Sequence, residues 1–202
     1  NKMIVLASFL VVIGMGFQAW LGKEVVDSNL LPLKITFHMI MALAILALLI
    51  FILHLTKNEK IYLKNKKKII YITLIGFIFT LIQIFSGTQV RQFIDLQMNE
   101  YPINNGLWLK FAPIKFYFHR SFSIIILVTH LYLFIEFYRN NFIPNVLKFM
   151  IATIGLEILT GVLMYYMNFP VSTQPIHLFL ATIIFSTQLY LLFQLTLTNK
   201  NQ

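Results

Sequence analysis

The chain has 202 residues, of which 58% are hydrophobic and 11% charged, and its formal net charge is +9. Soluble domains have about 45–50% apolar and about 25% charged residues, so this composition excludes that class and indicates a membrane protein. The positive charge does not indicate nucleic-acid binding, because the basic residues lie between apolar stretches. The absence of cysteine excludes disulfides and thiolate metal ligands, so any metal site has to use histidine.

Six apolar stretches reach the length of about 20 residues that a helix needs to cross the bilayer core. In chain order they are Met3–Leu21, Ile35–Leu55, Ile69–Ser86, Phe116–Tyr138, Val146–Met167 and Ile176–Thr196. They predict an all-α fold, namely a polytopic membrane helix bundle with six transmembrane helices. The first stretch lacks a small-residue cleavage site, so we interpret it as a helix and not as a signal peptide. Because the chain starts at Asn1 and not at Met, we expect a further hairpin upstream.

The turn after the second span is rich in lysine. The segment TKNEKIYLKNKKK (residues 56–68) holds six lysines and one glutamate. By the positive-inside rule, this turn and both termini are predicted to be cytoplasmic. The turn from Gly87 to Lys115 is then an outer loop, in which LWLKFAPIKF (residues 107–116) either lies along the membrane surface as a lid or serves as an interfacial anchor.

The first and third hairpins repeat one pattern at a constant offset of 139 residues. GFQAWLG (residues 16–22) is followed by His38, and GLEILTG (residues 155–161) is followed by His177. The middle hairpin carries a looser copy, with Gln83, Gly87 and then His119. We therefore expect a pseudo-repeat of helical hairpins, in which each outward helix ends in Gln or Glu, three residues and Gly, and each inward helix begins with His.

The recurrent histidines are the candidate metal ligands of this chain. A single one would be interpreted as an interfacial hydrogen-bonding residue, and a single glycine as a packing position. Recurrence at matched depth favours axial ligation of a heme that stands between helices, with His38, His119 and His177 as iron ligands. Gly22, Gly87 and Gly161 would then let the helices approach the porphyrin face.

A ligating imidazole needs an acceptor for its other N–H, and Gln18, Gln83 and Glu157 lie about one turn inside their helix ends. Glu157 has an alternative interpretation, as a protonated acid hydrogen-bonded to a neighbouring helix, because an ionisable group within a span is expensive. Arg120 and Arg91 either bind the heme propionates or extend to phospholipid.

Two further histidines are predicted to be ordinary polar residues. His130 lies eleven residues past His119, on nearly the same helix face but about 16 Å deeper. A second heme at that depth would need His54, which is near the cytoplasmic end of its helix. Counting ligands in pairs, residues 69–202 form a C-terminal four-helix heme-binding unit with His119 and His177. Residues 1–68 form a partial N-terminal half, in which His38 lacks its partner.

Taken together, these segments resemble the bacterial heme A synthase family, with the Bacteroidota type as the nearest likeness. The resemblance runs over essentially the whole chain. It is carried by GFQAWLGKEVVDSNLLPLKITFHMIMA, IQIFSGTQVR, KFYFHRSFS and EILTGVLMYYMNFPVSTQPIHLFLA.

The resemblance implies the third to eighth membrane helices of an eight-helix enzyme of the bacterial cytoplasmic (inner) membrane. That enzyme oxidises a methyl group of heme O to a formyl group, making heme A for terminal oxidases. His119 and His177 would bind the cofactor heme b, and His38 would lie in the half where the substrate heme O reacts. Heme O synthase (protoheme farnesyltransferase) and oxidase assembly factors are the implied partners. The first hairpin of the family, which is tied to catalysis, is absent, so the catalytic residues stay unknown and we expect the chain to be inactive alone.

Two other classes of function compete with this one. A diheme electron-transfer cytochrome of the b type would share the histidines but have no substrate. A transporter or assembly scaffold would use the histidines as proton relays and bind no heme. Heme pigment separates the synthase and the cytochrome from the transporter or scaffold. Turnover of heme O then separates the synthase from the cytochrome.

Overall fold

The structure is a computed structural model that describes residues 2–57, 63–101, 108–110, 112–170 and 172–197. The described residues form six helices: α1 (Lys2–Asp27), α2 (Pro32–Thr56), α3 (Lys66–Glu100), α4 (Ile114–Tyr138), α5 (Asn145–Tyr166) and α6 (Thr173–Thr196). All six are long and apolar enough to cross a membrane. The predicted all-α membrane fold is therefore confirmed.

The predicted outer loop is wrong over its first part, because α3 continues to Glu100. The helix runs thirteen residues beyond Gly87, which is about 20 Å at the helical rise. The sequence after Gly87 has no glycine or proline before Pro102, so no residue in it disfavours a helix. Its apolar side chains also recur at helical spacing, and Val90 and Ile94 are buried. Hydropathy identifies only the part of a helix that lipid surrounds, so the predicted span Ile69–Ser86 is shorter than the helix.

The chain forms two compact units, Asn1–Tyr62 together with Leu189–Gln202, and Leu63–Gln188. Helix α6 contributes to both units. This division concerns packing, whereas the predicted boundary at residue 68 separates two heme-binding halves. That boundary stays a prediction.

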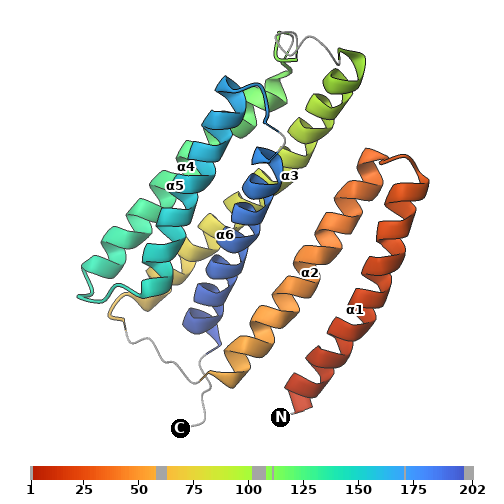
Figure 1. The fold of residues 1–202 in the computed structure, drawn as a ribbon. Coiled ribbons are helices and arrows are strands. Elements are labelled where there is room, and N and C mark those ends of the chain that lie inside the picture. Colours follow the sequence, from red (N-terminus) through yellow and green to blue (C-terminus); the bar gives the residue numbers. More distant parts are fainter. Residues whose placement is uncertain (1, 58–62, 102–107, 111, 171, 198–202) are drawn as a thin grey trace. The chain divides into compact units, whose positions relative to one another are not determined.

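In the first unit, α1 and α2 form an antiparallel hairpin (Figure 1). The helices approach closely at Gly14, where a Cβ atom would lie 3.1 Å from Cγ1 of Ile45. Near the connecting turn, Lys34 Nζ lies 2.7 Å from Oε2 of Glu24, and both side chains are about one third exposed. Close packing in the middle and an ion pair near the turn thus hold the hairpin.

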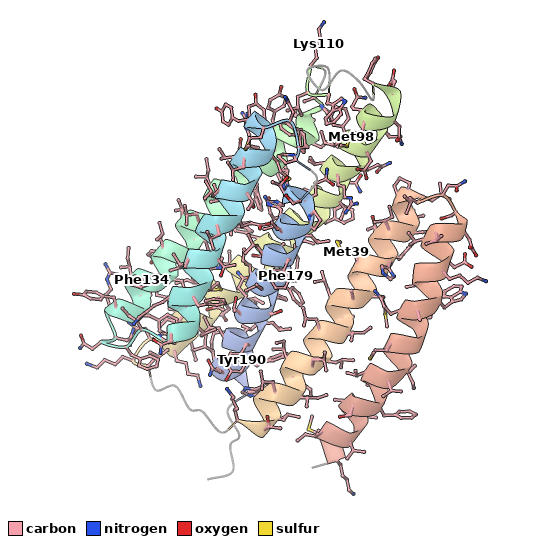
Figure 2. All side chains as sticks on the ribbon, viewed as in Figure 1. Met39, Met98, Lys110, Phe134, Phe179 and Tyr190 are labelled. Carbon is pink, nitrogen blue, oxygen red and sulfur yellow. The ribbon has the colours of Figure 1, made fainter. Side chains whose placement is uncertain are left out.

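In the second unit, α3 and α4 form a hairpin, α5 packs beside α4, and the first part of α6 completes the bundle (Figure 1). Met98 and Lys110 lie at one end of this unit, and Phe134 lies toward the other (Figure 2). The core is apolar, and its largest fully buried apolar side chains are Phe137, Ile69, Ile94, Leu133, Leu147 and Met150. At the Phe134 end, the buried carboxylate of Glu136 pairs with Lys68 at 2.8 Å and with Arg139 at 3.0 Å.

The backbone repeats the pattern found in the sequence. After α1, Asn29 and Leu30 have positive φ angles of 51° and 63°, and after α5, Asn168 and Phe169 both have 54°. The chain therefore leaves both helices through the same left-handed turn, which bulky residues rarely adopt. The closing hydrogen bonds also match at the offset of 139, with Leu30 N donating to Val25 O at 2.9 Å and Phe169 N donating to Met164 O at 3.0 Å. The predicted repeat is confirmed for the first and third hairpins, whereas the middle hairpin differs because α3 continues to Glu100.

Candidate functional site

His119 and His177 meet in the second unit. His119 lies near the start of α4 and His177 near the start of α6. Their ring centroids are 6.4 Å apart and the ring planes are inclined by 70°. Both residues are half-buried. The fold thus brings together two imidazoles that are separated by 58 residues in the sequence.

The separation of the two rings fits a metal ion between them. A metal–nitrogen bond is about 2 Å long, and a ring nitrogen lies about 1 Å from the ring centre. Two imidazoles that bind opposite faces of one metal therefore have centroids about 6 Å apart. The observed 6.4 Å agrees with this value. The donor set itself, two neutral nitrogen ligands, is one that heme iron accepts.

Each of the two imidazoles lies against a glycine of the preceding helix. A Cβ atom added to Gly87 would lie 3.0 Å from Cε1 of His119, and one added to Gly161 would lie 3.6 Å from Cε1 of His177. The glycines therefore leave room for the histidine rings. Their predicted contact with a porphyrin face is a separate claim and stays a prediction.

A serine that the sequence analysis did not single out binds the ring of His119. Ser86 Oγ lies 3.0 Å from Nδ1 of His119, and the same hydroxyl group donates to the carbonyl oxygen of Gln83 at 2.9 Å. Ser86 directly precedes Gly87. The glycine lets the ring of His119 lie close to α3, and the serine hydroxyl then contacts its Nδ1.

A threonine plays the matching part in the third hairpin. Thr160 Oγ1 lies 2.8 Å from Nδ1 of His177 and donates to the carbonyl oxygen of Glu157 at 2.9 Å. Thr160 directly precedes Gly161. The signal was present in the sequence, because a hydroxyl residue stands before the glycine in both of these hairpins. The sequence analysis assigned the ring acceptors to Gln and Glu and so did not include these hydroxyl residues.

Of the side chains predicted to accept the second ring N–H, Glu157 and Gln18 contact the rings of their histidines, whereas Gln83 does not. Gln83 Nε2 donates to the backbone oxygen of His119 at 2.9 Å, so it ties the two helices together without touching the ring. Glu157 does reach the ring of His177, but at Nε2, which lies 3.2 Å from Oε1. One atom of each of these side chains, Gln83 Oε1 and Glu157 Oε2, is buried without a hydrogen-bond partner among the described residues.

His38 lies in the first unit and has a similar glycine neighbour. A Cβ atom added to Gly22 would lie 3.3 Å from its Cε1. Gln18 Nε2 lies 3.2 Å from Nε2 of His38 and 3.1 Å from its backbone oxygen. Within the described part of the chain, Nδ1 of His38 is buried and has no hydrogen-bond partner. Leu21 stands where the other two hairpins have a hydroxyl residue.

The two arginines predicted at the site are exposed. The guanidinium carbon of Arg120 lies 5.3 Å from the ring centroid of Tyr117 and 5.7 Å from that of Tyr165. Arg91 Nε lies 3.4 Å from Oδ2 of Asp95 on the next turn of α3. Both interactions leave the guanidinium groups accessible, so propionate binding stays a prediction for each.

His130 has protein partners at both ring nitrogens. Its Nδ1 lies 2.7 Å from the backbone oxygen of Ile126, and its Nε2 lies 2.5 Å from Nε2 of Gln188. The residue is buried, and a Cβ atom on Gly76 would lie 3.2 Å from its ring. His54 is also buried, beside the ring of Phe193. This geometry agrees with the interpretation of both as polar packing residues.

Trp108 belongs to a buried apolar cluster that includes two residues of the α3 extension, Val90 and Ile94. Its Nε1 donates to the backbone oxygen of Tyr101 at 2.9 Å. Its ring packs in a cluster of buried side chains formed by Val90, Ile94, Phe116 and Phe169. Trp108 therefore stabilises the extension of α3. The remainder of the proposed lid includes Leu107 and Phe111, which lie outside the described residues.

One comparison with known families is decisive. The family model COX15-CtaA, described as cytochrome oxidase assembly protein, matches residues 1–189. The chain belongs to this family. Membership in the cytochrome oxidase assembly family indicates a role in oxidase assembly and heme A synthesis, and the six apolar helices make this member a multi-pass membrane protein. No curated protein and no solved structure matches the chain.

Proposed function

We propose that the chain acts in heme A synthesis as a heme A synthase, in which His119 and His177 are the two axial ligands of a heme b. The observation that carries this proposal is the imidazole pair with ring centroids 6.4 Å apart. The family match supports the role in heme A synthesis independently of this geometry. The reaction proposed for the whole enzyme is oxidation of a methyl group of heme O to a formyl group.

In this proposal the protein positions the heme and the heme supplies the redox chemistry. Gly87 and Gly161 give the two imidazoles room, and Gln83 fixes the start of α4 through the backbone of His119. Arg120 and Arg91 are exposed, and we propose that they pair with the heme propionates. His38 is proposed as one ligand of the substrate heme O in the N-terminal half.

The cellular setting is part of the same proposal. We place the chain in the bacterial cytoplasmic membrane, with both termini and the lysine-rich turn on the cytoplasmic side. His119 and His177, at the starts of α4 and α6, are then near the outer surface. Heme O synthase is the proposed donor of the substrate, and oxidase assembly factors are the proposed acceptors of the product.

Visible absorption spectra of the purified chain, with and without added heme b, test the ligand assignment. We expect a low-spin spectrum that is lost in His119→Ala and in His177→Ala, because each change removes one axial ligand. His130→Ala is the matched control, since it removes an imidazole from the same helix that has partners at both nitrogens. An unchanged spectrum in both ligand variants would reject the assignment.

A turnover assay separates the enzyme from the electron-transfer cytochrome. The protein is incubated with heme O, and the extracted hemes are identified by mass. A formyl product indicates the synthase. A protein that keeps its low-spin spectrum but returns only heme O, under conditions where a known synthase turns over, would support the b-type cytochrome.

A further inference from the structure

We infer that Ser86 and Thr160 are positioning residues that keep the proton of each ligand imidazole on Nδ1 and so leave Nε2 free to bind iron. The inference rests on the proposed function, because it concerns the same two histidines. It goes beyond the ligand assignment, because it says which tautomer each ring has before heme binds and which side chains select it.

Each of the two hydroxyl groups has a single hydrogen. A serine or threonine hydroxyl donates once and accepts at its lone pairs. Ser86 Oγ donates to the backbone oxygen of Gln83 at 2.9 Å, which uses its only hydrogen. Its 3.0 Å contact with Nδ1 of His119 must then be an N–H donation from the ring to the oxygen. A neutral imidazole with its proton on Nδ1 has a bare lone pair on Nε2.

His177 follows the same logic. Thr160 Oγ1 donates to the backbone oxygen of Glu157 at 2.9 Å and contacts Nδ1 of the ring at 2.8 Å. The two hydroxyls thus have identical places in the sequence pattern and identical hydrogen-bond roles. Metal-bound imidazoles depend on an acceptor at the other nitrogen for tautomer and orientation. Both rings therefore have the tautomer that ligation through Nε2 requires, although at His177 the contact of Nε2 with Glu157 Oε1 must first be given up.

Each hydroxyl group selects the tautomer through a single hydrogen bond to the ring. Removing it should therefore leave a mixture of tautomers and not the opposite tautomer. At His177, Glu157 Oε1 lies 3.2 Å from Nε2. A neutral carboxyl group donating to Nε2 agrees with the inferred tautomer, whereas a carboxylate would draw the proton to Nε2. His119 is thus the simpler test.

The first measurement uses the heme-free full chain. Nitrogen-15 NMR of histidine-labelled protein distinguishes protonated from bare ring nitrogens, with His119→Gln and His177→Gln spectra used for assignment. We expect Nδ1 protonated and Nε2 bare at His119, and a mixture of tautomers in Ser86→Ala. Ser86→Thr restores the hydroxyl group and is the matched control. A proton found on Nε2 of His119 in the unmodified chain would overturn the inference without any substitution.

The second measurement uses heme b. Loss of an outer partner of a metal ligand typically weakens metal affinity about 10–100-fold, so we expect losses toward the lower end in Ser86→Ala and Thr160→Ala. We also expect the midpoint potential to rise, because the Nδ1–H bond to oxygen adds electron density to the ring and favours ferric iron. A residue with only a structural role would change heme retention but not the tautomer or the potential.

The outcomes separate the two proposals. Normal heme binding by the unmodified chain, together with an unchanged tautomer, affinity and potential in Ser86→Ala, would overturn only the role of the hydroxyls. Failure of the unmodified chain to bind heme would overturn the ligand assignment and this inference with it. Glu157→Gln gives the third hairpin the same residue type as Gln83 in the second, and we expect it to retain the Nδ1 proton on His177.

Discussion

The α1–α2 and α3–α4 hairpins both pack a glycine against a histidine ring, but they differ in the hydrogen-bond partner of its Nδ1. In both, a glycine on the first helix faces the imidazole of the second, at 3.3 Å for Gly22 and His38 and at 3.0 Å for Gly87 and His119. The residue before the glycine is leucine in one and serine in the other. Nδ1 of His119 consequently has a hydroxyl partner, whereas Nδ1 of His38 has none among the described residues.

This difference separates two requirements for a ligand histidine. The first is space for the ring, which both hairpins meet with glycine. The second is a fixed proton, which the α3–α4 hairpin meets with Ser86. In the α1–α2 hairpin the polar ring contact is at Nε2 instead, where Gln18 Nε2 lies 3.2 Å away. The first hairpin thus holds its imidazole in place without the hydroxyl contact at Nδ1.

The largest expected effect tests the shared requirement for space. Gly87→Ala places a methyl group 3.0 Å from His119 Cε1, which is tighter than most Cβ contacts, so the ring has to shift. Overpacking of this kind costs about 1–3 kcal/mol, so we expect heme b affinity to fall tenfold or more. Gly22→Ala should displace the ring of His38 less, and Gly161→Ala should displace that of His177 least, because their contacts would be 3.3 and 3.6 Å. Heme titration of the Gly87 and Gly161 variants measures whether heme affinity falls more in Gly87→Ala than in Gly161→Ala.

The chain supplies matched controls for that series. Added Cβ atoms on Gly16 and Gly155 would meet nothing within 4 Å. Alanine at either position should leave heme binding unchanged and stabilise its helix by about 0.5–1 kcal/mol. If Gly155→Ala reduced heme affinity as much as Gly87→Ala, contact with the histidine ring would not be the reason for the glycine.

A smaller effect tests how the hairpins are held by charge. Glu136 is buried at 2% exposure and pairs with both Lys68 and Arg139, whereas Glu24 pairs with Lys34 and is about one third exposed. Replacing Glu136 by Gln removes two ion pairs at one buried carboxylate, whereas Glu24→Gln removes one ion pair at a partly exposed carboxylate. The Glu136 change should therefore lower the Tm in detergent more. Thermal unfolding at low and high salt measures both. An equal fall in Tm for the two variants would contradict this ranking.

The smallest effect tests the difference between the hairpins directly. Leu21→Thr supplies the hydroxyl group that the first hairpin lacks, and Leu21→Val is the control with nearly the same shape and no hydroxyl. We expect nitrogen-15 NMR to show a higher population of the Nδ1-protonated tautomer of His38 in the threonine variant only. The same shift in both variants would mean that the side-chain volume, not the hydrogen bond, controls the ring.

The sequence by itself determined that the protein is embedded in a lipid bilayer, that it has six long helices and that two of its hairpins are equivalent. Six apolar stretches of spanning length predicted α1 to α6 because a bilayer imposes a minimum length on any helix that crosses it. The offset of 139 residues predicted equivalent hairpins, and the matched left-handed turns at Asn29 and Asn168 follow that offset. The pattern also identified His119 and His177, since recurrence at one depth is visible without coordinates.

Only the tertiary structure decided what each polar side chain contacts. The 6.4 Å separation of the rings, the hydroxyl partners Ser86 and Thr160, and the second partner of His130 all depend on facing helices. The extension of α3 to Glu100 likewise depends on packing against Trp108 and Phe116. Hydropathy is a property of one segment and its surroundings. A hydrogen bond between helices depends on how both helices are rotated and aligned along their axes, and the residue pattern within one segment does not determine this.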